Sequence, residues 1–388
     1  MTMSEWDRHG LGWDLTELIL SKLPLRSMVR ASAVCRAWRD VLLAHHHHHH
    51  HRPWLFLHGH NNVVPRLGRT AFAYDPAAPD SWVSFSLPPG CFAGAGGFAF
   101  ASPSPSRLAF APLLREGDAA WRHAPTLASS RCSPVVAALP SSSTDTSSGV
   151  FLVVGGARFV GGLVDIEDGR LPTELYHHDV DTSSRWEQCA PLPAEFGSSS
   201  SLCLSSAVVG AGRFFFVYGT YSCTVSAFDL SRRAWTPARE LRPAPGLVAA
   251  FLASGRGGRR LLLAGVDQGG AGAFGVWDVD PETLAARKIG EMPPELRELM
   301  MSISQEDVAV RCVGEDGLLY VVSDEQHRAY PACACEVVGD GGGDRLWCRW
   351  SKLPPLPVAG SSALISRFHK MVAFCSPVLL RHHLVNLN

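Results

Sequence analysis

The residue patterns in this chain that could support catalysis or metal binding are few, and each has a structural explanation. Gly270, Gly272 and Gly275 have the G-x-G-x-x-G spacing of a dinucleotide site, but such a site needs a helix after the glycines. Here they lead into 276–279, Val-Trp-Asp-Val, which is typical of a strand. The cysteines at 333, 335 and 348 have no partner pair at zinc-ligand spacing. We therefore expect buried thiols there, no metal, no cofactor and no catalytic residue.

Composition excludes several classes of partner. The 388 residues are 46% hydrophobic and 18% charged, which is typical of a folded, strand-rich protein. A net charge of −1 argues against nucleic acid or an anionic membrane as the main partner. The first 14 residues contain no apolar signal region, and the apolar stretch 371–380 is too short to span a bilayer. We expect a soluble protein of the nucleus, the cytoplasm or both, and we expect its eleven cysteines to be free.

The segment from Asp14 to Leu43 predicts three short helices. Apolar side chains recur at the three-and-four spacing of one helical face, at Leu15, Leu18, Ile19 and Leu23. Pro24 ends this helix because it lacks an amide hydrogen. A second helix is expected from Arg26 or Ser27, and a third carries Cys35 to Leu42. Three such helices cannot enclose a self-sufficient core, so the segment reads as a docking unit.

The runs Leu18 to Ser27 and Val34 to Arg39, with Leu-Pro-Leu and Val-Cys-Arg-x-Trp at their centres, resemble the F-box motif. In F-box proteins of SCF ubiquitin ligases, this motif binds the Skp adaptor. The usual Leu-Pro before the first helix is replaced here by Gly12-Trp13-Asp14. The resemblance implies that the adaptor contacts lie among Leu15, Ile19, Leu23, Pro24, Leu25, Val34, Cys35 and Trp38. Leu18 and Val34 could equally pack the helices together.

The charge of the helical segment suits an acidic partner. Between Leu15 and Leu43, Lys22 and four arginines stand against Glu17 and Asp40. Seven histidines follow at 45–51; an expanded spacer is the favoured interpretation, and metal binding by this run stays open. We expect a flexible N-terminus over 1–13, the F-box over 14–44, a His-rich linker over 45–53, a second domain over 54–380 and a tail over 381–388.

A repeated unit fills the second domain. An apolar run ends in glycine, a polar loop and a strand ending in aspartate follow, and a tryptophan stands six or seven residues later. The clearest copy has the run 151–154 before Gly155 and Gly156, then Tyr176, Asp179 and Trp186. Other copies begin at 55, 215, 261 and 318, and a degraded one spans 108–111 with Trp121. We interpret each tryptophan as filling the gap between two neighbouring sheets.

This unit resembles the kelch repeat, whose four-stranded blades form a β-propeller. Residues 54–380 would give six or seven blades of roughly 50 residues, so length alone leaves the number open. The tryptophan-type positions favour six: Trp82, Trp121, Trp186, Trp235, an apolar substitute near Ile289, and Trp350. The predicted fold is thus a small all-α three-helix F-box followed by an all-β kelch-type propeller. We expect 363–380 to supply closing strands for the first or last blade.

The residues just after the glycine-terminated runs occupy equivalent places in a closed ring, so they should share one rim. We predict target-binding residues among them: His60, Asn61, Arg158, Phe159, Tyr221, Asp267, Gln268 and Gln326. Arg and Tyr are favoured interface anchors, so Arg158 and Tyr221 lead this set. For any one of them a solvated loop is the competing interpretation.

The combined layout is that of plant F-box/kelch-repeat proteins. The resemblance implies a non-catalytic substrate-recognition subunit of an SCF ligase, with Skp adaptor, cullin and RING subunits as partners and an unknown protein marked for proteasomal degradation. A propeller binding protein outside any ligase, such as a transcriptional co-regulator, is the first alternative. A copper radical oxidase on the same fold is the second. It would need Tyr, Cys and His around the channel, whereas this chain has only six tyrosines.

Overall fold

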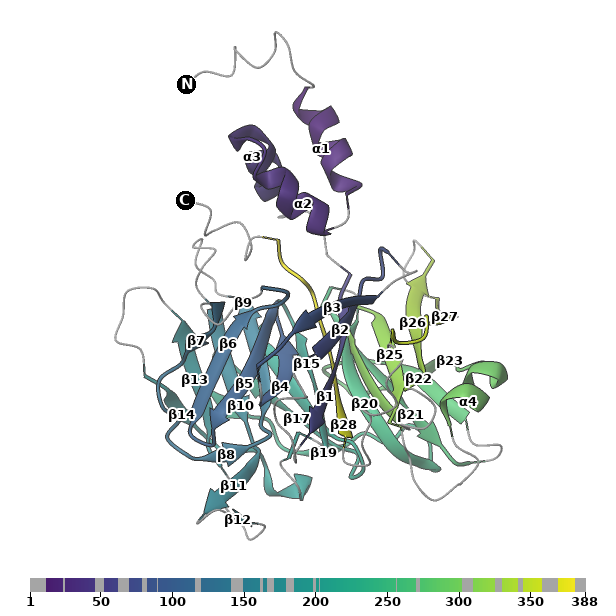
Figure 1. Ribbon diagram of the computed structural model, residues 1–388. Helices are drawn as coiled ribbons and strands as arrows, with labels where there is room; N and C mark the ends of the chain where they lie inside the picture. Colours follow the sequence, from purple (N-terminus) through teal and green to yellow (C-terminus); the bar gives the residue numbers. More distant parts are fainter. Residues whose placement is uncertain are drawn as a thin grey trace.

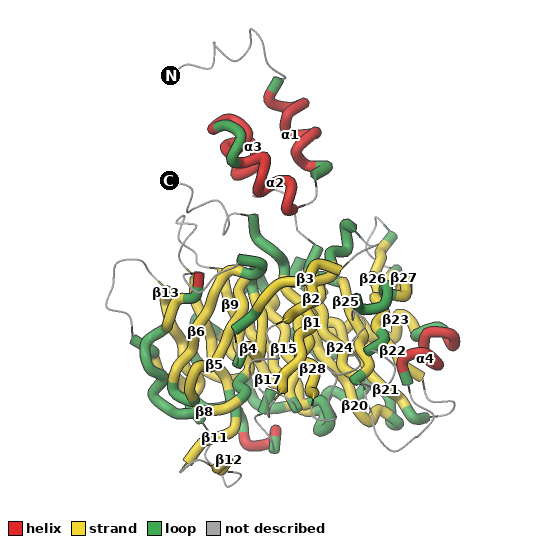
Figure 2. The backbone as a smooth tube through the Cα atoms, viewed as in Figure 1, coloured by secondary structure: helices red, strands yellow, loops and turns green. Residues whose placement is uncertain are grey.

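A computed structural model describes most of the chain (Figure 1). The described residues are 12–23, 25–45, 52–61, 70–78, 82–88, 90–115, 120–140, 149–160, 163–165, 171–178, 185–197, 200–201, 203–255, 257–269, 273–301, 310–324, 330–340, 345–357 and 369–380. Figure 2 shows helices gathered at one end and strands making up nearly all of the remaining body. The helix and strand segments are therefore separate units in space, as they are in the sequence.

The N-terminal unit consists of α1 (Trp13–Ser21), α2 (Leu25–Ser32) and α3 (Arg36–His45). The amides of Lys22 and Leu23 donate to the carbonyls of Ile19 and Leu20, which closes α1. The second helix begins at Leu25, one residue before the predicted start, because Leu25 already has helical backbone geometry. Cys35 precedes α3 and does not belong to it.

Six antiparallel sheets follow in the described part of the chain, five with four strands and one with five, and each is one blade. Blade 1 contains β28 (His369–Ser376), β1 (Trp54–Asn61), β2 (Thr70–Tyr74) and β3 (Trp82–Ser86). Blade 2 contains β4 (Cys91–Ala95), β5 (Phe98–Ser104), β6 (Arg107–Pro112) and β7 (Arg122–His123). Blade 3 contains β9 (Val135–Pro140), β10 (Gly149–Val154), β13 (Thr173–His178) and β14 (Glu187–Cys189).

The other three blades have the same strand order. Blade 4 contains β15 (Leu204–Val209), β16 (Phe214–Gly219), β17 (Thr224–Asp229) and β18 (Ala234–Trp235), and β19 (Arg239–Glu240) also pairs with β17. Blade 5 contains β20 (Leu247–Gly255), β21 (Arg260–Asp267), β22 (Ala273–Val279) and β23 (Ala286–Glu291). Blade 6 contains β24 (Val310–Glu315), β25 (Leu318–Ser323), β26 (Ala332–Gly339) and β27 (Leu346–Lys352).

The ring is closed by the last strand. The first strands of the blades, β28, β4, β9, β15, β20 and β24, contact one another in a complete circle. β28 pairs with β1 along its whole length, from Trp54 opposite Ser376 to Asn61 opposite His369. The prediction of six blades is confirmed, and so is the prediction that the C-terminal stretch completes the first of them.

The repeated tryptophans join neighbouring blades, as predicted. The indole nitrogen of Trp82 donates to the Pro354 carbonyl of blade 6 at 2.9 Å. That of Trp186 donates to Pro125, in the segment after blade 2, at 2.8 Å. That of Trp235, in blade 4, donates to the Ala190 carbonyl, just after the last strand of blade 3, at 3.1 Å. Each ring therefore fills the inter-blade gap with its apolar body and satisfies its one donor across it.

The degraded repeat copy was assigned to the wrong strand. Residues 108–111 lie in β6, the third strand of blade 2, whereas the other apolar runs form second strands. The second strand of this blade is β5, where alternating Phe and Ala residues made the run less visible. Residues 99–101 of β5 and 108–111 of β6 are buried without alternation, so periodicity alone could not separate the two strands.

Three smaller elements complete the described structure. β8 (Arg131–Cys132), β11 (Ala157–Val160) and β12 (Leu163–Asp165) form a small sheet beside blade 3. Gly156 enters it with φ +91°, and a side chain there would meet the Cys132 carbonyl at 2.8 Å. The others are a 3-10 turn, η3 (Ala194–Phe196), and α4 (Pro294–Met300). No helix in the described ranges is long and apolar enough to cross a membrane. All eleven cysteines are free, and five of them are buried: Cys91, Cys223, Cys312, Cys333 and Cys335.

Candidate functional site

The first helix presents an apolar face to solvent. Leu15, Leu18 and Ile19 share one side of α1 and are all exposed, Leu18 by 55%. The opposite side buries Thr16 and Leu20. Of the seven exposed large apolar residues among those described, five belong to the helical unit: Trp13, Leu15, Leu18, Ile19 and Val34. An exposed apolar patch concentrated on so small a unit is typical of a protein-binding surface.

The residues predicted to contact an adaptor separate into three groups. Leu15, Ile19 and Val34 are exposed and available for contact. Leu23 and Trp38 are half-buried and pack against the hydrophobic core of the helical unit, and Cys35 is half-buried. Pro24 lies outside the described residues, and the side chain of Leu25 does too. The exposed Trp13 and Leu18 were not in the predicted set, although Leu18 had the helical spacing that could have placed it there.

A second feature is a cavity of about 680 Å³ along the axis of the propeller. It is bounded by the first strands of all six blades and opens where the second strands end, near Thr220 and Tyr221. These first strands are sheet edges, so their outer backbone N–H and C=O groups face the channel. Its lining includes both hydroxyl-bearing and apolar residues, among them Ser102, Ser133, Ser201, Ser205, Phe92, Val136, Phe251 and Val313.

The charged groups that line the cavity are already paired. Arg131 forms a fully buried ion pair with Glu174, and its guanidinium also donates to the carbonyls of Gly155 and Pro172 at 3.1 and 3.0 Å. Burial lowers the pKa of Arg131, and the Glu174 carboxylate opposes this shift. Arg311 donates through Nε to Asp324 at 2.8 Å. The cavity therefore suits an uncharged polar and apolar group better than a phosphate or a free ion.

The predicted rim residues have diverse surroundings. Tyr221 is 57% exposed and lines the mouth of the cavity. Asp267 ends β21 and accepts the Gly269 amide at 3.0 Å, and Gln268 is exposed beside it. His60 and Asn61 lie within β1, paired with Lys370 and His369, and not in a loop after it.

Two further predicted residues lie in the small sheet. Arg158 and Phe159 belong to β11, so the expected rim loop is in fact a strand. The structure describes the backbone of these two residues and of His60 and Asn61, and not their side chains. Gln326 lies outside the described residues. The sequence analysis missed Arg131, Arg311 and Asp324, which line the cavity. The sequence around one strand end does not show which residues face the propeller axis.

The helical face and the cavity mouth lie on opposite sides of the propeller. Figure 1 shows α1–α3 beyond one face, and the small sheet of β8, β11 and β12 at the other. β1 begins at Trp54 on the side of the helices and ends at Asn61 on the far side, which sets the direction of every second strand. A partner of the helices and a ligand in the cavity mouth would thus be separated by the depth of the ring.

Comparison with known proteins bears on both parts of the chain. Residues 14–52 match the family model described as F-box-like. An F-box/kelch-repeat protein of Arabidopsis thaliana is 26% identical over 371 residues, which cover 90% of this chain and 85% of that protein. The chain is an F-box/kelch protein. Its three helices are accordingly the F-box, and the ring behind them is a kelch-type propeller with six blades.

Solved structures similar to this chain include two of low sequence identity. The β-propeller domain of Cps50 (Swd1) from Myceliophteria thermophila has a TM-score of 0.40 and 9% identity, covering 77% of this chain and 87% of its own. The SapL1 lectin in complex with alpha methyl fucoside has a TM-score of 0.43 and 12% identity, covering 78% and 96%. Neither likeness bears on what this protein binds. F-box domains in general bind Skp-type adaptors.

Proposed function

We propose that this F-box/kelch protein is the substrate-recognition subunit of an SCF-type ubiquitin ligase. The F-box binds the Skp adaptor, which brings cullin and RING subunits, and the propeller holds the protein to be ubiquitinated for proteasomal degradation. The chain itself makes and breaks no bonds. It raises the effective concentration of target lysines near the ubiquitin-loaded conjugating enzyme. The complex would act in the nucleus, the cytoplasm or both.

The observation that carries this proposal is the exposed face of Leu15, Leu18 and Ile19. Fully burying one such side chain contributes about 1.5–3 kcal/mol, so three of them can anchor a stable interface. Charge supports the same partner, because Lys22, Arg30 and Arg36 are exposed on the helical unit and would attract an acidic adaptor.

A pull-down with purified Skp adaptor tests the F-box half of the proposal. Leu18→Asp places a charge in the middle of the exposed face and should abolish adaptor binding without lowering the melting temperature. The matched control is Tyr221→Asp, an exposed site on the propeller, which should bind adaptor normally. Unchanged adaptor binding by Leu18→Asp would refute the docking surface. Adaptor binding without co-purification of cullin would refute the ligase assignment and favour a binding protein outside any ligase.

We propose the cavity mouth as the place where the propeller holds its target. It combines a pocket of the size used for ligands with an exposed tyrosine at its edge. Because the charges around it are paired, the target would insert an uncharged segment. Full-length Leu18→Asp protein retains targets but cannot pass them to a ligase, so it serves as a trap. Proteins captured by this trap should be lost when Tyr221→Asp is added, and their retention would exclude the mouth as the target site.

A further inference from the structure

The last described residues of the chain contact both the propeller and the F-box. After β28, the segment Pro377–Leu380 leaves the first blade on the side of the helices (Figure 1). Val378 and Leu380 are each 1% exposed. They belong to one hydrophobic cluster with residues of both units, namely Leu20, Met28, Ala31, Val41, Leu42, Trp54, Phe56, Phe85 and Leu113.

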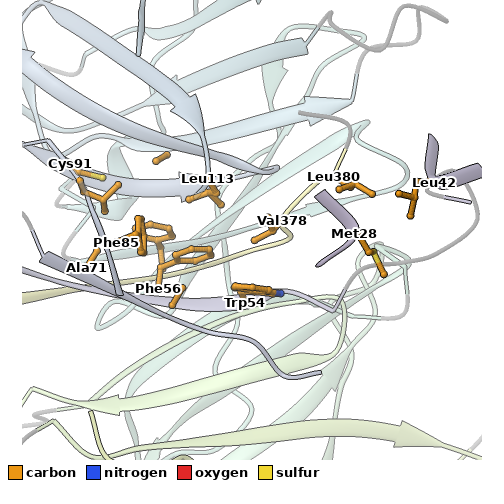
Figure 3. Packing of buried hydrophobic residues seen from close by; sticks show 14 of the residues in the cluster. Met28, Leu42, Trp54, Phe56, Ala71, Phe85, Cys91, Leu113, Val378 and Leu380 are labelled. Atoms are coloured by element: carbon orange, nitrogen blue, oxygen red, sulfur yellow. The ribbon is translucent and has the colours of Figure 1, made fainter. Parts of the chain in front are cut away.

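Leu380 and Val378 lie toward different domains within this cluster. Figure 3 shows Leu380 beside Leu42 and Met28 of the F-box, and Val378 on the propeller side, toward Phe56. A four-residue segment of C-terminal chain therefore fills the space between the two domains with apolar side chains. Such a continuous apolar contact holds two bodies in one relative orientation, because any rotation would expose buried surface.

Residues 52–54, which lead from the F-box into β1, are held on the helix side of the propeller by separate contacts. Arg52 forms an ion pair with Glu336 of blade 6. The Tyr320 hydroxyl, also of blade 6, donates to the Pro53 carbonyl at 2.8 Å, and Trp54 is buried directly after it. The propeller thus holds the entry of its own chain at blade 6, while the segment after blade 1 contacts the helices. One attachment would let the F-box swing about it, whereas two attachments restrict that motion.

We propose that the segment 377–380 is a bridge that fixes the orientation of the F-box on the propeller. Val378 and Leu380 act as positioning residues. The fixed orientation follows from the contacts alone, and only its effect on ubiquitin transfer depends on the proposed function. Transfer by proximity depends on where the acceptor lysine is held, and the cavity mouth lies on the far side of the ring from the F-box. A rigid connection keeps that separation constant.

Two variants with the same chemical change test the bridge in the full-length chain. Leu380→Asp buries a charge within the bridge, and Leu18→Asp places one on exposed surface. In small-angle X-ray scattering, Leu380→Asp should increase the radius of gyration. In hydrogen exchange, amides of α2 and α3 should exchange at least about tenfold faster. Leu18→Asp should change neither quantity. Adaptor binding should show the reverse pattern, kept by Leu380→Asp and lost by Leu18→Asp.

Unchanged scattering and exchange in Leu380→Asp would overturn the bridge. Leu380→Ala, which removes packing without adding charge, should shift both measurements in the same direction by less, and it covers the case in which the aspartate variant fails to fold. In a reconstituted ligase, ubiquitin on the chain's own propeller lysines serves as the probe. The wild type should favour one of Lys288, Lys352 and Lys370, and Leu380→Ala should make ubiquitin more evenly distributed among them. No transfer by the wild type, with the scattering result intact, would count against the proposed function alone.

Discussion

Leu15, Leu18 and Ile19 are exposed on one face of a nine-residue helix, whereas Trp82, Trp186 and Trp235 are at least half-buried and hydrogen-bonded across blades. Both sets are large apolar side chains that recur at regular spacing. In the propeller the recurrence repeats a packing contact, so each copy has a partner within the chain. In the F-box the small helical unit leaves part of its apolar surface for another protein. Regular spacing therefore identifies apolar surface, and the size of the surrounding unit decides whether the chain itself covers it.

The largest contrast should come from one substitution made in both regions. Trp186→Ala removes a buried indole and its bond to Pro125, so the free energy of unfolding should fall by about 3–5 kcal/mol. Trp13→Ala removes an exposed indole, so unfolding should change by no more than about 0.5 kcal/mol while adaptor affinity falls. Denaturant unfolding and adaptor titration measure the two effects. Equal stability losses would mean that the F-box face is covered within the chain.

A smaller effect is expected at the buried ion pair of blade 3. Glu174→Gln leaves the Arg131 guanidinium buried without its counter-charge, and we expect a loss of about 3 kcal/mol in unfolding free energy. Gln keeps an acceptor for the Ala128 amide, so the loss of unfolding free energy should lie at the lower end of the range for broken buried ion pairs. Glu240→Gln breaks the exposed pair with Arg242 and should cost at most about 1 kcal/mol. Chemical denaturation with a similar result for both variants would contradict the structural role of Arg131.

The pH dependence of stability should carry a signature of one carboxyl group at the end of β24. Burial and the neighbouring Asp316 raise the pKa of Glu315, the last residue of β24, to about 7 from 4.5. Because the folded-state pKa is raised, this group's contribution is fully present below pH 4.5 and is lost as the pH rises to 7. Glu315→Gln should equal the wild type at pH 4 and exceed its stability above roughly pH 7. Thermal melts across this range check it, and parallel curves would contradict it.

The smallest stability effect is expected at the cavity mouth. Tyr221→Ala truncates an exposed side chain, so the free energy of unfolding should change by less than about 0.5 kcal/mol. If the mouth holds the target, this variant should nevertheless lose capture in the Leu18→Asp trap. Ser231→Ala, at the opposite end of blade 4, is the matched control and should keep it. Equal capture by both variants would show that the target binds elsewhere.

The sequence predicted the helices well and their outward face less well. Three-and-four spacing identified Leu15, Leu18 and Ile19, but it assigned equal weight to Leu23, which packs against the core. Trp38 was expected at the adaptor and is also packed against that core. In helices of eight to ten residues, the interhelical angle decides which apolar residues remain exposed to solvent. The residue spacing within one helix does not determine that angle.

The proposed rim residues do not all lie in the loops that the repeat pattern predicted, since His60 and Asn61 belong to β1 and Arg158 and Phe159 to β11. Equivalent repeat positions do lie at the ends of second strands, since every blade has the same strand order. The small sheet that takes up Arg158 was missed because β8 precedes β11 by about 25 residues and belongs to no repeat. Arg131 was missed for a related reason, because its partner Glu174 lies 43 residues away on another strand.

The chain's local patterns by themselves determined that there are two domains, that one is helical and one is a propeller, and that tryptophans join the blades. These features depend on contacts between near neighbours or on a motif that recurs, so spacing encodes them. Only the tertiary structure decided that the cavity mouth lies opposite the F-box and that Leu380 packs beside Met28 and Leu42. Those relations join residues hundreds of positions apart, and they exist only once the last strand has closed the ring.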